Sequence, residues 1–129
     1  MPMNPGTDLA LLPLPTRPNK LCVLAYSALI GELLFIAMNT APQIGYAVSS
    51  LTKYMVVSIP AYLEVAKPVL RYLRGVQGDM IRWCARDVSS THAVGEVYDY
   101  ADASFANDST NRKSTLAYFV FVNNALFSW

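Results

Sequence analysis

Hydrophobic residues recur at two different spacings along the chain, and the change of spacing separates a helical part from an extended part. The stretch from Leu21 to Met38 is apolar almost throughout and is long enough to form one long helix. Two further segments carry apolar residues at helical spacing: Ile44, Ala47, Val48, Leu51 and Met55, followed by Tyr62, Val65, Ala66, Val69 and Leu73. The pattern therefore predicts three helices between residues 25 and 75.

Local residue types indicate where these helices begin and end. Thr40 followed by Gln43 fits a capping box, in which the Thr side chain caps the helix and the Gln side chain reaches back to the backbone N–H of the cap. Pro42 is compatible with this position, because first-turn N–H groups have no helical partner. Ser58 is predicted to cap the third helix, and Gly75 is predicted to end it.

The pattern becomes extended after Gly78. The segment DMIRWCARD predicts a short strand, and GEVYDYADASF predicts a longer strand rich in Val and Tyr. The segment from Thr115 to Val122 is apolar on both faces, which is typical of a central, buried strand. Asn123 and Asn124 tolerate positive φ and predict a two-residue turn into a last strand, ALFSW. We therefore expect an α+β protein in which N-terminal helices precede an antiparallel set of strands.

The predicted organisation has three parts. Residues 1–24 form an extended, Pro-rich lead-in, residues 25–78 a helical segment, and residues 79–129 a β segment. The lead-in has neither the charged region nor the apolar region of a signal peptide. The chain ends inside or just after its last strand, and three strands with an unfinished edge predict a truncated domain.

The segment Leu21–Met38 allows a second interpretation. Its 18 residues would span about 27 Å as a helix, which is close to the minimum for a bilayer. The apolar side chains favour insertion, whereas Glu32 opposes it by about 2.5 kcal/mol if it behaves like Asp on the insertion scale. We favour a buried helix of a soluble fold. The alternative is a small membrane-associated protein that uses Leu21–Met38 as a hydrophobic anchor.

Composition narrows the class of protein further. The chain has 129 residues, of which 53% are hydrophobic, so it has the length of about one domain and is not disordered by composition. The formal net charge of +1 gives no overall attraction to nucleic acid or membrane, so any electrostatic role must be local. Cys22 and Cys84 match no zinc or disulfide spacing. An intracellular protein with free thiols, cytoplasmic or nuclear, is the expectation.

Basic residues gather at two places. Lys67, Arg71 and Arg74 are spaced i, i+4 and i+7, which aligns three cations along one face of the predicted third helix. Such a face is either simply solvated or contacts phosphates, because sequence-independent affinity for nucleic acid comes mainly from such cations. Arg112 and Lys113 lie in the polar run YADASFANDSTNRKST, where they form a hairpin loop or approach a substrate backbone. On residue types alone, Asp102 in the same run is a surface acid.

Four blocks of the sequence carry a resemblance. In order, MPMNPGTDL, AYSALIGELLFIAMNTAPQIGYAVSSLTKYM, YLEVAKPVLRYLRGV and YADASFANDSTNRKSTLAYFVFVNNALFSW are similar to the Pol polyprotein of copia-type LTR retrotransposons. In that family the reverse transcriptase ends in Y-x-x-L-I-G-x-L-x-Y-L-A…T-R-P-D-I-x-Y-A-V and A-K-x-V-L-R-Y-L-K-G-T. The ribonuclease H domain then opens with Y-S-D-A-D-W-A-G-D…R-K-S-T-S-G-Y-V-F…S-W. The four blocks follow one another at natural spacing and cover nearly the whole chain.

The resemblance implies which parts of the polyprotein are present. The helices resemble the thumb and connection of the reverse transcriptase, and the strands resemble an incomplete start of ribonuclease H. The polymerase's paired aspartates would lie before Met1. The first aspartate of Y-S-D-A-D, a ribonuclease H metal ligand in the family, corresponds to Asp102, and the remaining acids would lie beyond Trp129. In the family, Mg²⁺ supports hydrolysis of RNA–DNA hybrids, and nothing matches Glu96, Asp99 or Asp108 to its ligands.

Several positions depart from the family pattern. Ala41 and Gln43 replace the Arg and Asp of T-R-P-D, and Ser104 replaces the second acid of D-A-D. Leu116 and Ala117 replace Ser-Gly. Pro68 lies within the predicted third helix, where loss of an N–H and crowding of the Glu64 carbonyl cost about 3 kcal/mol. These departures predict a decayed or mispredicted fragment.

Three functions are compatible with these observations. The first is a polyprotein remnant without catalytic activity of its own, with at most weak binding to nucleic acid or an RNA–DNA hybrid, and with an Asp102 that binds metal weakly. The second is the membrane-associated protein described above. The third is a host-adopted module that binds the remainder of the retroelement polyprotein, specifically its polymerase.

Overall fold

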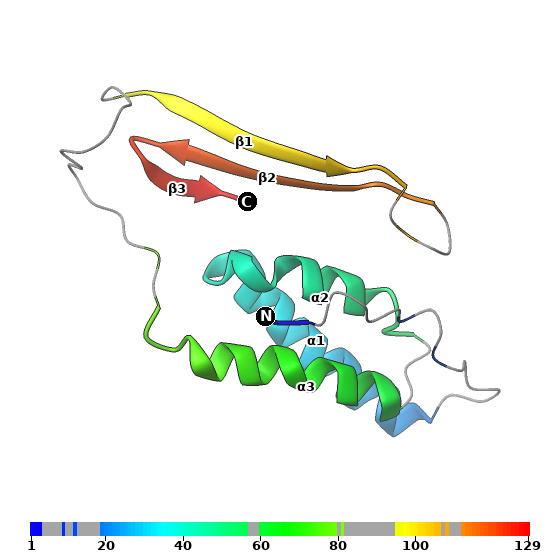
Figure 1. Ribbon diagram of the computed structural model, residues 1–129. Helices are drawn as coiled ribbons and strands as arrows, with labels where there is room; N and C mark the ends of the chain where they lie inside the picture. The colour runs from blue at the N-terminus through cyan, green and yellow to red at the C-terminus, as the bar shows by residue number, and fades with distance from the viewer. Residues whose placement is uncertain are drawn as a thin grey trace. The chain divides into compact units, whose positions relative to one another are not determined.

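The computed structural model describes residues 1–3, 9, 12, 19–56, 60–79, 81, 95–106, 108 and 112–129. Its elements run in the order three α-helices and then three β-strands, so the predicted α+β fold class is confirmed (Figure 1). The chain divides into two compact units, Met1–Asp79 and Met80–Trp129. The first unit contains the helices and the second contains an incomplete antiparallel sheet.

The long helix predicted from the apolar run is present as α1 (Lys20–Asn39). It begins at Asn19, whose side chain accepts a hydrogen bond from the N–H of Leu21 and so satisfies one of the unpaired first-turn donors. One stripe of α1 is buried, at the i, i+4, i+7 and i+11 positions Tyr26, Ile30, Leu33 and Ala37. The opposite side exposes further large apolar residues: Leu21, Leu24, Phe35 and Met38.

The predicted capping box at Thr40 is wrong. Thr40 is the C-terminal cap of α1, and both its N–H and its hydroxyl donate to the carbonyl of Ile36, at 2.9 and 3.2 Å. The residue before the following 3-10 helix (Pro42–Ile44) is Ala41, which makes no side-chain cap. The Ala41 N–H also donates to the Ile36 carbonyl, at 2.9 Å, so the last turn of α1 is closed by backbone and side-chain donors together. Pro42 opens the 3-10 helix, where its missing N–H costs little.

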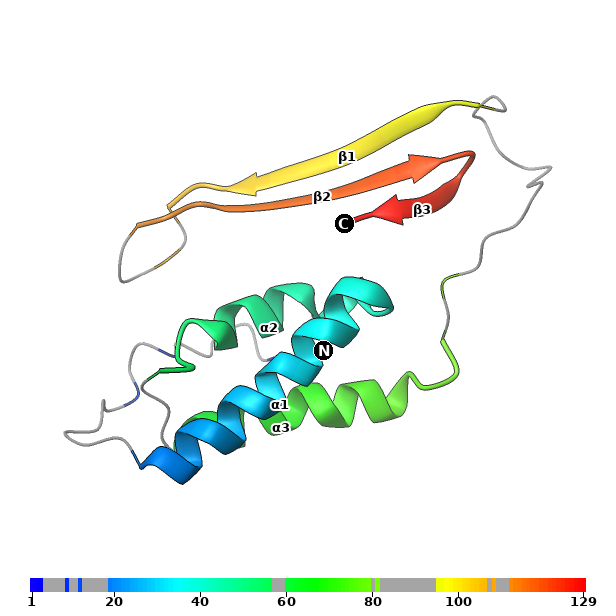
Figure 2. The ribbon, with the colours of Figure 1, turned by 180° about the vertical axis from the view of Figure 1, so that it is seen from behind.

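The two shorter helices complete the unit as α2 (Gly45–Thr52) and α3 (Pro60–Gly75). The chain reverses direction between α1 and α2 and again between α2 and α3 (Figure 2). The apolar stripes predicted from spacing face the core, where Ile44, Ala47, Val48, Leu51, Tyr62, Ala66 and Val69 are buried. Gly75 is the last residue of α3, as predicted, and the predicted cap Ser58 lies outside the described residues.

A tyrosine cluster occupies the middle of this core. The Tyr54 and Tyr62 rings are stacked with centroids 4.7 Å apart, and the Tyr26 and Tyr62 ring centroids are 6.1 Å apart. The Tyr26 hydroxyl donates to the carbonyl of Leu51 at 2.8 Å, which ties α1 to the end of α2. Burial, together with the neighbouring tyrosines, raises the pKa of Tyr26 above its ordinary value of 10.0.

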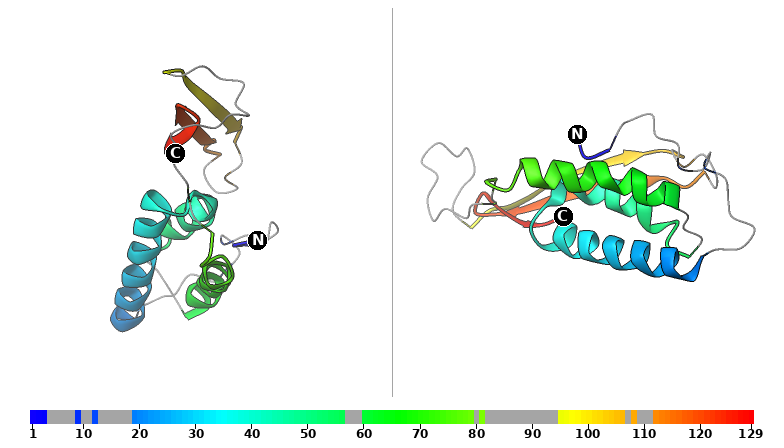
Figure 3. Two further views of the ribbon diagram at one scale, coloured as in Figure 1. Left: turned by 90° about the vertical axis from the view of Figure 1, so that its left-hand side faces the viewer. Right: turned by 90° about the horizontal axis from the view of Figure 1, so that it is seen from below.

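Pro68 does not interrupt α3. The helix is continuous from Pro60 to Gly75 with Pro68 inside it, so the expected local cost is absorbed without a break (Figure 3, left, looks almost along α3). Tyr62, Ala66 and Val69 are fully buried on either side of the proline. Their burial supplies the packing that holds the helix together despite the missing N–H.

The second unit is a three-stranded antiparallel sheet of order β1-β2-β3. Its strands are β1 (Val97–Ser104), β2 (Thr115–Val122) and β3 (Ala125–Ser128). Val97 pairs with Val122 and Ser104 with Thr115, and the β2–β3 pairing contains a bulge between Val120 and Phe121. The predicted turn is confirmed: Asn123 and Asn124 have φ of 52° and 63°. The predicted strand DMIRWCARD lies mostly outside the described residues, and Asp79 and Ile81 in it are not in a strand.

The prediction that β2 is a central, buried strand is half correct. The strand is central, but Leu116, Tyr118 and Phe119 on it are exposed. On one face of the sheet, Tyr98, Tyr100 and Phe121 pack ring against ring with centroids 5.1 to 5.9 Å apart. The apolar residues on both faces of β2 correctly predicted its central place in the sheet. Burial of those residues requires a second layer packed against the sheet, and the described part of this unit does not contain one.

Candidate nucleic-acid interface

Helix α3 presents the predicted basic residues on its solvent side. Lys67, Arg71 and Arg74 are all exposed, while Tyr62, Ala66 and Val69 of the same helix are buried. The helical period places the two sets on different faces, because core residues and cations each recur every three or four positions. We call Lys67, Arg71 and Arg74 the basic face.

One cation of the basic face has an intramolecular partner. The Lys67 ammonium contacts the Glu64 carboxylate one turn earlier, and both side chains are more than half exposed. An exposed pair of this kind contributes at most about 1 kcal/mol. The i, i+3 spacing makes this pair readable from the sequence, although the prediction of the basic face did not include it. The pair leaves Arg71 and Arg74 as the stronger positive charges of the face.

Asp102 lies on β1 opposite Ala117, with its side chain exposed. Its Oδ1 accepts a hydrogen bond from the backbone N–H of Ala103 at 2.9 Å. Asp99 is three positions away, so the alternation of a strand places it on the other face of the sheet. The two nearest acids of the strand therefore cannot act together on one ion.

The Mg²⁺ that the resemblance implies does not fit the residues at Asp102. Catalysis by two metal ions requires several carboxylates converging on ions roughly 4 Å apart. Among the residues that the structure describes, no group of three or more His, Cys, Asp and Glu side chains could hold a metal ion. Asp102 alone supplies one carboxylate, and one of its oxygens already accepts the Ala103 N–H.

Arg112 and Lys113 lie in the connection between β1 and β2, and both are exposed. Arg112 adopts a positive φ of 57°, and its N–H donates to the carbonyl of Asp108 at 2.9 Å. The N–H of Asp108 in turn donates to the carbonyl of Lys113. These two backbone bonds join Asp108 to the two exposed cations Arg112 and Lys113.

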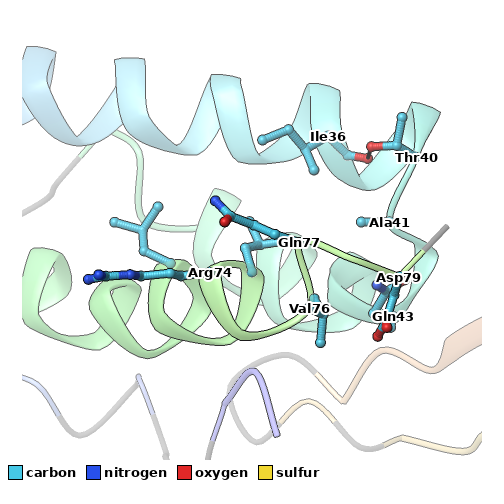
Figure 4. Close-up of a pocket in the computed structure, with 10 residues that line it drawn as sticks. Ile36, Thr40, Ala41, Gln43, Arg74, Val76, Gln77 and Asp79 are labelled. Atoms are coloured by element: carbon cyan, nitrogen blue, oxygen red, sulfur yellow. Dashed lines mark hydrogen bonds between the residues drawn. The ribbon is translucent and has the colours of Figure 1, made fainter.

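A pocket that the sequence did not reveal lies where α1 and α3 end (Figure 4). Its volume is about 530 Å³, and it is lined by Ile36, Thr40, Ala41, Gln43, Leu70, Leu73, Arg74, Val76, Gln77 and Asp79. Arg74 lies at one end, Gln43 and Asp79 lie at the other, and Gln77 between them points toward α1 (Figure 4). No sequence motif marks these positions, because residues 36–43 and 70–79 meet only through the packing of the helices.

Helix α1 has the length and apolar composition of a membrane-crossing helix. Among the described residues it is the one helix that meets both criteria, with 22% of its most apolar 18-residue window buried. A core helix of a soluble protein meets the same criteria, and Tyr26, Ile30 and Leu33 of α1 are core residues. Length and composition therefore leave both interpretations of α1 open.

Comparison with known proteins agrees with the four sequence blocks. The Pol polyproteins of transposon TNT 1-94 from Nicotiana tabacum and transposon RE1 from Arabidopsis thaliana, both named retrovirus-related, are 31% and 33% identical to the chain over 104 residues. A secreted RxLR effector protein of Plasmopara viticola is 26% identical over 104 residues, which are 69% of its length. No protein-family model and no solved structure matches the chain.

The matches cover most of this chain but only a small part of each polyprotein. The matched region covers 81% of this chain but only 7% of each plant polyprotein. The predicted resemblance to a retrotransposon polyprotein is thereby confirmed. Over 104 residues, the chain is similar to a short region of retrovirus-related Pol polyproteins from transposons.

Proposed function

We propose that this chain is a polyprotein fragment without catalytic activity of its own, whose helical unit binds the phosphate backbone of nucleic acid weakly through the basic face. The observation that carries the proposal is the alignment of Lys67, Arg71 and Arg74 on the exposed side of α3. The overall charge of +1 provides no competing attraction, so binding would depend on this face. The kinship with transposon Pol polyproteins supports nucleic acid as the partner.

Salt dependence measures the number of phosphate contacts directly. Binding of a labelled RNA–DNA hybrid should be independent of sequence and should weaken with a log–log salt slope of about −2 to −3 for three contacts. Arg71→Glu should weaken binding and flatten the slope, because it removes one of the three contacts. Lys20→Glu is the matched control, because it changes the net charge equally at the first residue of α1, away from the basic face. Equal binding by both variants would mean that the basic face is solvated and does not contact phosphates.

The absence of catalysis is proposed from the donor set around Asp102. A single carboxylate in water attracts a unit charge by about 1 kcal/mol, whereas millimolar affinity requires about 4 kcal/mol. The chain with Mg²⁺ or Mn²⁺ should therefore leave the RNA strand of a hybrid intact, and Asp102→Asn should behave like the unchanged chain. Cleavage that disappears in Asp102→Asn would overturn the proposal.

The sheet favours a partner from the rest of such a polyprotein. Val97, Tyr100, Leu116, Tyr118 and Phe127 are exposed, which places apolar surface on both faces of a thin sheet. Exposed apolar surface of this kind marks an interaction site. Co-purification with the ribonuclease H and polymerase segments of a related polyprotein should be lost in Leu116→Asp, while Arg71→Glu should retain it.

Membrane association is the second candidate, and the exposed side of α1 favours it. Leu21, Leu24, Phe35 and Met38 face outward on a helix of sufficient length. Insertion would require the core residues Tyr26 and Leu33 to leave the helical unit, or α1 to lie along the surface with only its exposed side in lipid. A carbonate-resistant membrane fraction would support this candidate, and recovery in the soluble fraction would exclude it.

A further inference from the structure

We propose that the pocket at the ends of α1 and α3 accepts a single unpaired nucleobase, and that it prefers bases with an exocyclic amino group, such as cytosine and adenine. This inference rests on the proposed binding of a phosphate backbone by the basic face. It adds that the partner is single-stranded at this point and that one base is read.

The connection between the two sites is Arg74. It is the last cation of the basic face, and it also lines one end of the pocket (Figure 4). A nucleic-acid backbone that follows Lys67, Arg71 and Arg74 along α3 therefore arrives at the mouth of the pocket. A phosphate held by the Arg74 guanidinium leaves its attached base near the pocket, because only the sugar separates the phosphate from the base of the same nucleotide.

The interior of the pocket suits the flat, apolar faces of a base. Ile36, Leu70, Leu73 and Val76 supply apolar walls from both helices. The volume of about 530 Å³ lies within the range of sites that hold small ligands. Duplex nucleic acid cannot present a base in this way without extruding it, which makes an unpaired strand the cheaper partner.

The polar groups at the far end decide which base fits. Asp79 and Gln43 both line the pocket and are seen at the same end in Figure 4, and Gln77 is seen between them and Arg74. A carboxylate only accepts hydrogen bonds, so Asp79 pairs with an amino group and repels a carbonyl oxygen. Cytosine carries an amino group where thymine and uracil carry a carbonyl, and adenine carries one where guanine carries a carbonyl. The amides of Gln43 and Gln77 can donate to the ring nitrogen beside that amino group in either base.

The test compares short single strands of identical charge. Fluorescence anisotropy with labelled oligo-dC, oligo-dA, oligo-dT and an abasic strand should give about fivefold tighter binding of oligo-dC and oligo-dA than of the other two. Asp79→Asn should remove this preference, because an amide both donates and accepts, while leaving the salt slope unchanged. Gln77→Ala should weaken the binding of oligo-dC and leave the binding of the abasic strand unchanged. Asp79 and Gln77 are exposed and follow the end of α3, so neither change threatens the fold.

The outcomes separate the two proposals. Salt-dependent binding that is equal for oligo-dC, oligo-dT and the abasic strand would overturn the base pocket and leave the basic face intact. Binding of the RNA–DNA hybrid but of no single strand would also overturn the base pocket alone. Binding of neither the strands nor the hybrid, or binding that Arg71→Glu does not weaken, would overturn the proposed function itself. A preference for oligo-dC that survives in Asp79→Asn would also exclude this pocket as its origin.

Discussion

In α1, two neighbouring leucines have opposite surroundings: Leu33 is 1% exposed in the core, and Leu34 is 40% exposed on the outer side. On β2 no such contrast exists, because Leu116 and Tyr118 on one face and Phe119 on the other are all substantially exposed. The helical unit thus buries one stripe of each helix against the others. The described part of the sheet unit buries one hydrophobic residue, Ala106. A similar apolar content makes a core only where a second layer is available.

The largest expected effect lies in the helical core. Leu33→Ala should lower the free energy of unfolding by about 2 to 5 kcal/mol, because it removes buried side-chain volume. Leu34→Ala in the same turn and Leu116→Ala in the sheet should each change it by about 0.5 kcal/mol or less. Urea unfolding followed by far-UV circular dichroism measures all three. A Leu116→Ala chain as unstable as Leu33→Ala would mean that the sheet is buried and would end the contrast between the units.

The buried hydroxyl of Tyr26 gives the next effect. Tyr26→Phe removes the hydrogen bond to the Leu51 carbonyl and leaves that acceptor without its partner, at a cost of about 1 to 2 kcal/mol. Tyr98→Phe, which removes a hydroxyl bonded to the Asn124 side chain in the sheet, should cost less because Tyr98 is only partly buried. The same unfolding measurement compares the two variants. Equal losses would show that the sheet hydroxyl is as well shielded as the core one.

The raised pKa of Tyr26 predicts alkaline instability of the helical unit. Above pH 10 the unfolded chain ionises this tyrosine and the folded chain does not, so the unfolded state is increasingly favoured. The stability associated with Tyr26 is therefore complete below pH 10 and declines as the pH rises toward its raised pKa. Unfolding midpoints measured between pH 8 and 12 should fall more steeply for the unchanged chain than for Tyr26→Phe. Parallel curves would contradict the assignment to Tyr26.

A last effect, similar in size to that of Tyr26→Phe, concerns the turn that joins β2 and β3. Asn123 adopts φ of 52°, which β-branched residues reach only with strain, and its side chain accepts the N–H of Gly95. Asn123→Val should destabilise the sheet by about 1 to 2 kcal/mol. Asn123→Gly loses the same side-chain bond but keeps the positive φ without strain, so it is the matched control and should be milder. The β-sheet signal in circular dichroism, followed during unfolding, measures the stability of both variants. If Asn123→Val does not lower that stability, the conformation of the turn does not determine the stability of the sheet.

Local chemistry made most of the fold predictable. Helical spacing located the buried residues Val48, Leu51 and Val69, and two asparagines in a row located a turn that only residues tolerant of positive φ can form. Thr40 was misassigned because a hydroxyl can cap the helix that follows or close the helix that precedes it. The Ile36 carbonyl that decides between them belongs to the preceding helix.

The candidate sites were less accessible to prediction. The basic face follows from i, i+4, i+7 spacing within one helix, so Lys67, Arg71 and Arg74 could be grouped from sequence alone. The pocket needs Gln43 and Asp79 to meet, and these residues are brought together by the packing of α1 and α3. The effect of Pro68 could not be predicted from the sequence either, because the cost of a proline inside a helix depends on how well the neighbouring side chains pack that helix.

The bond between Asp102 and the Ala103 N–H bears on how the chain behaves at high concentration. Asn123 donates to the Glu96 carbonyl, so the alternation of an antiparallel pair turns the backbone groups of Val97, Asp99, Ala101 and Ala103 toward the outer edge of β1. Outward-facing amides of this kind template the addition of foreign strands. Because Asp102 accepts one of these N–H groups and places a negative charge beside it, we expect it to disfavour the pairing of a foreign strand at that end of β1.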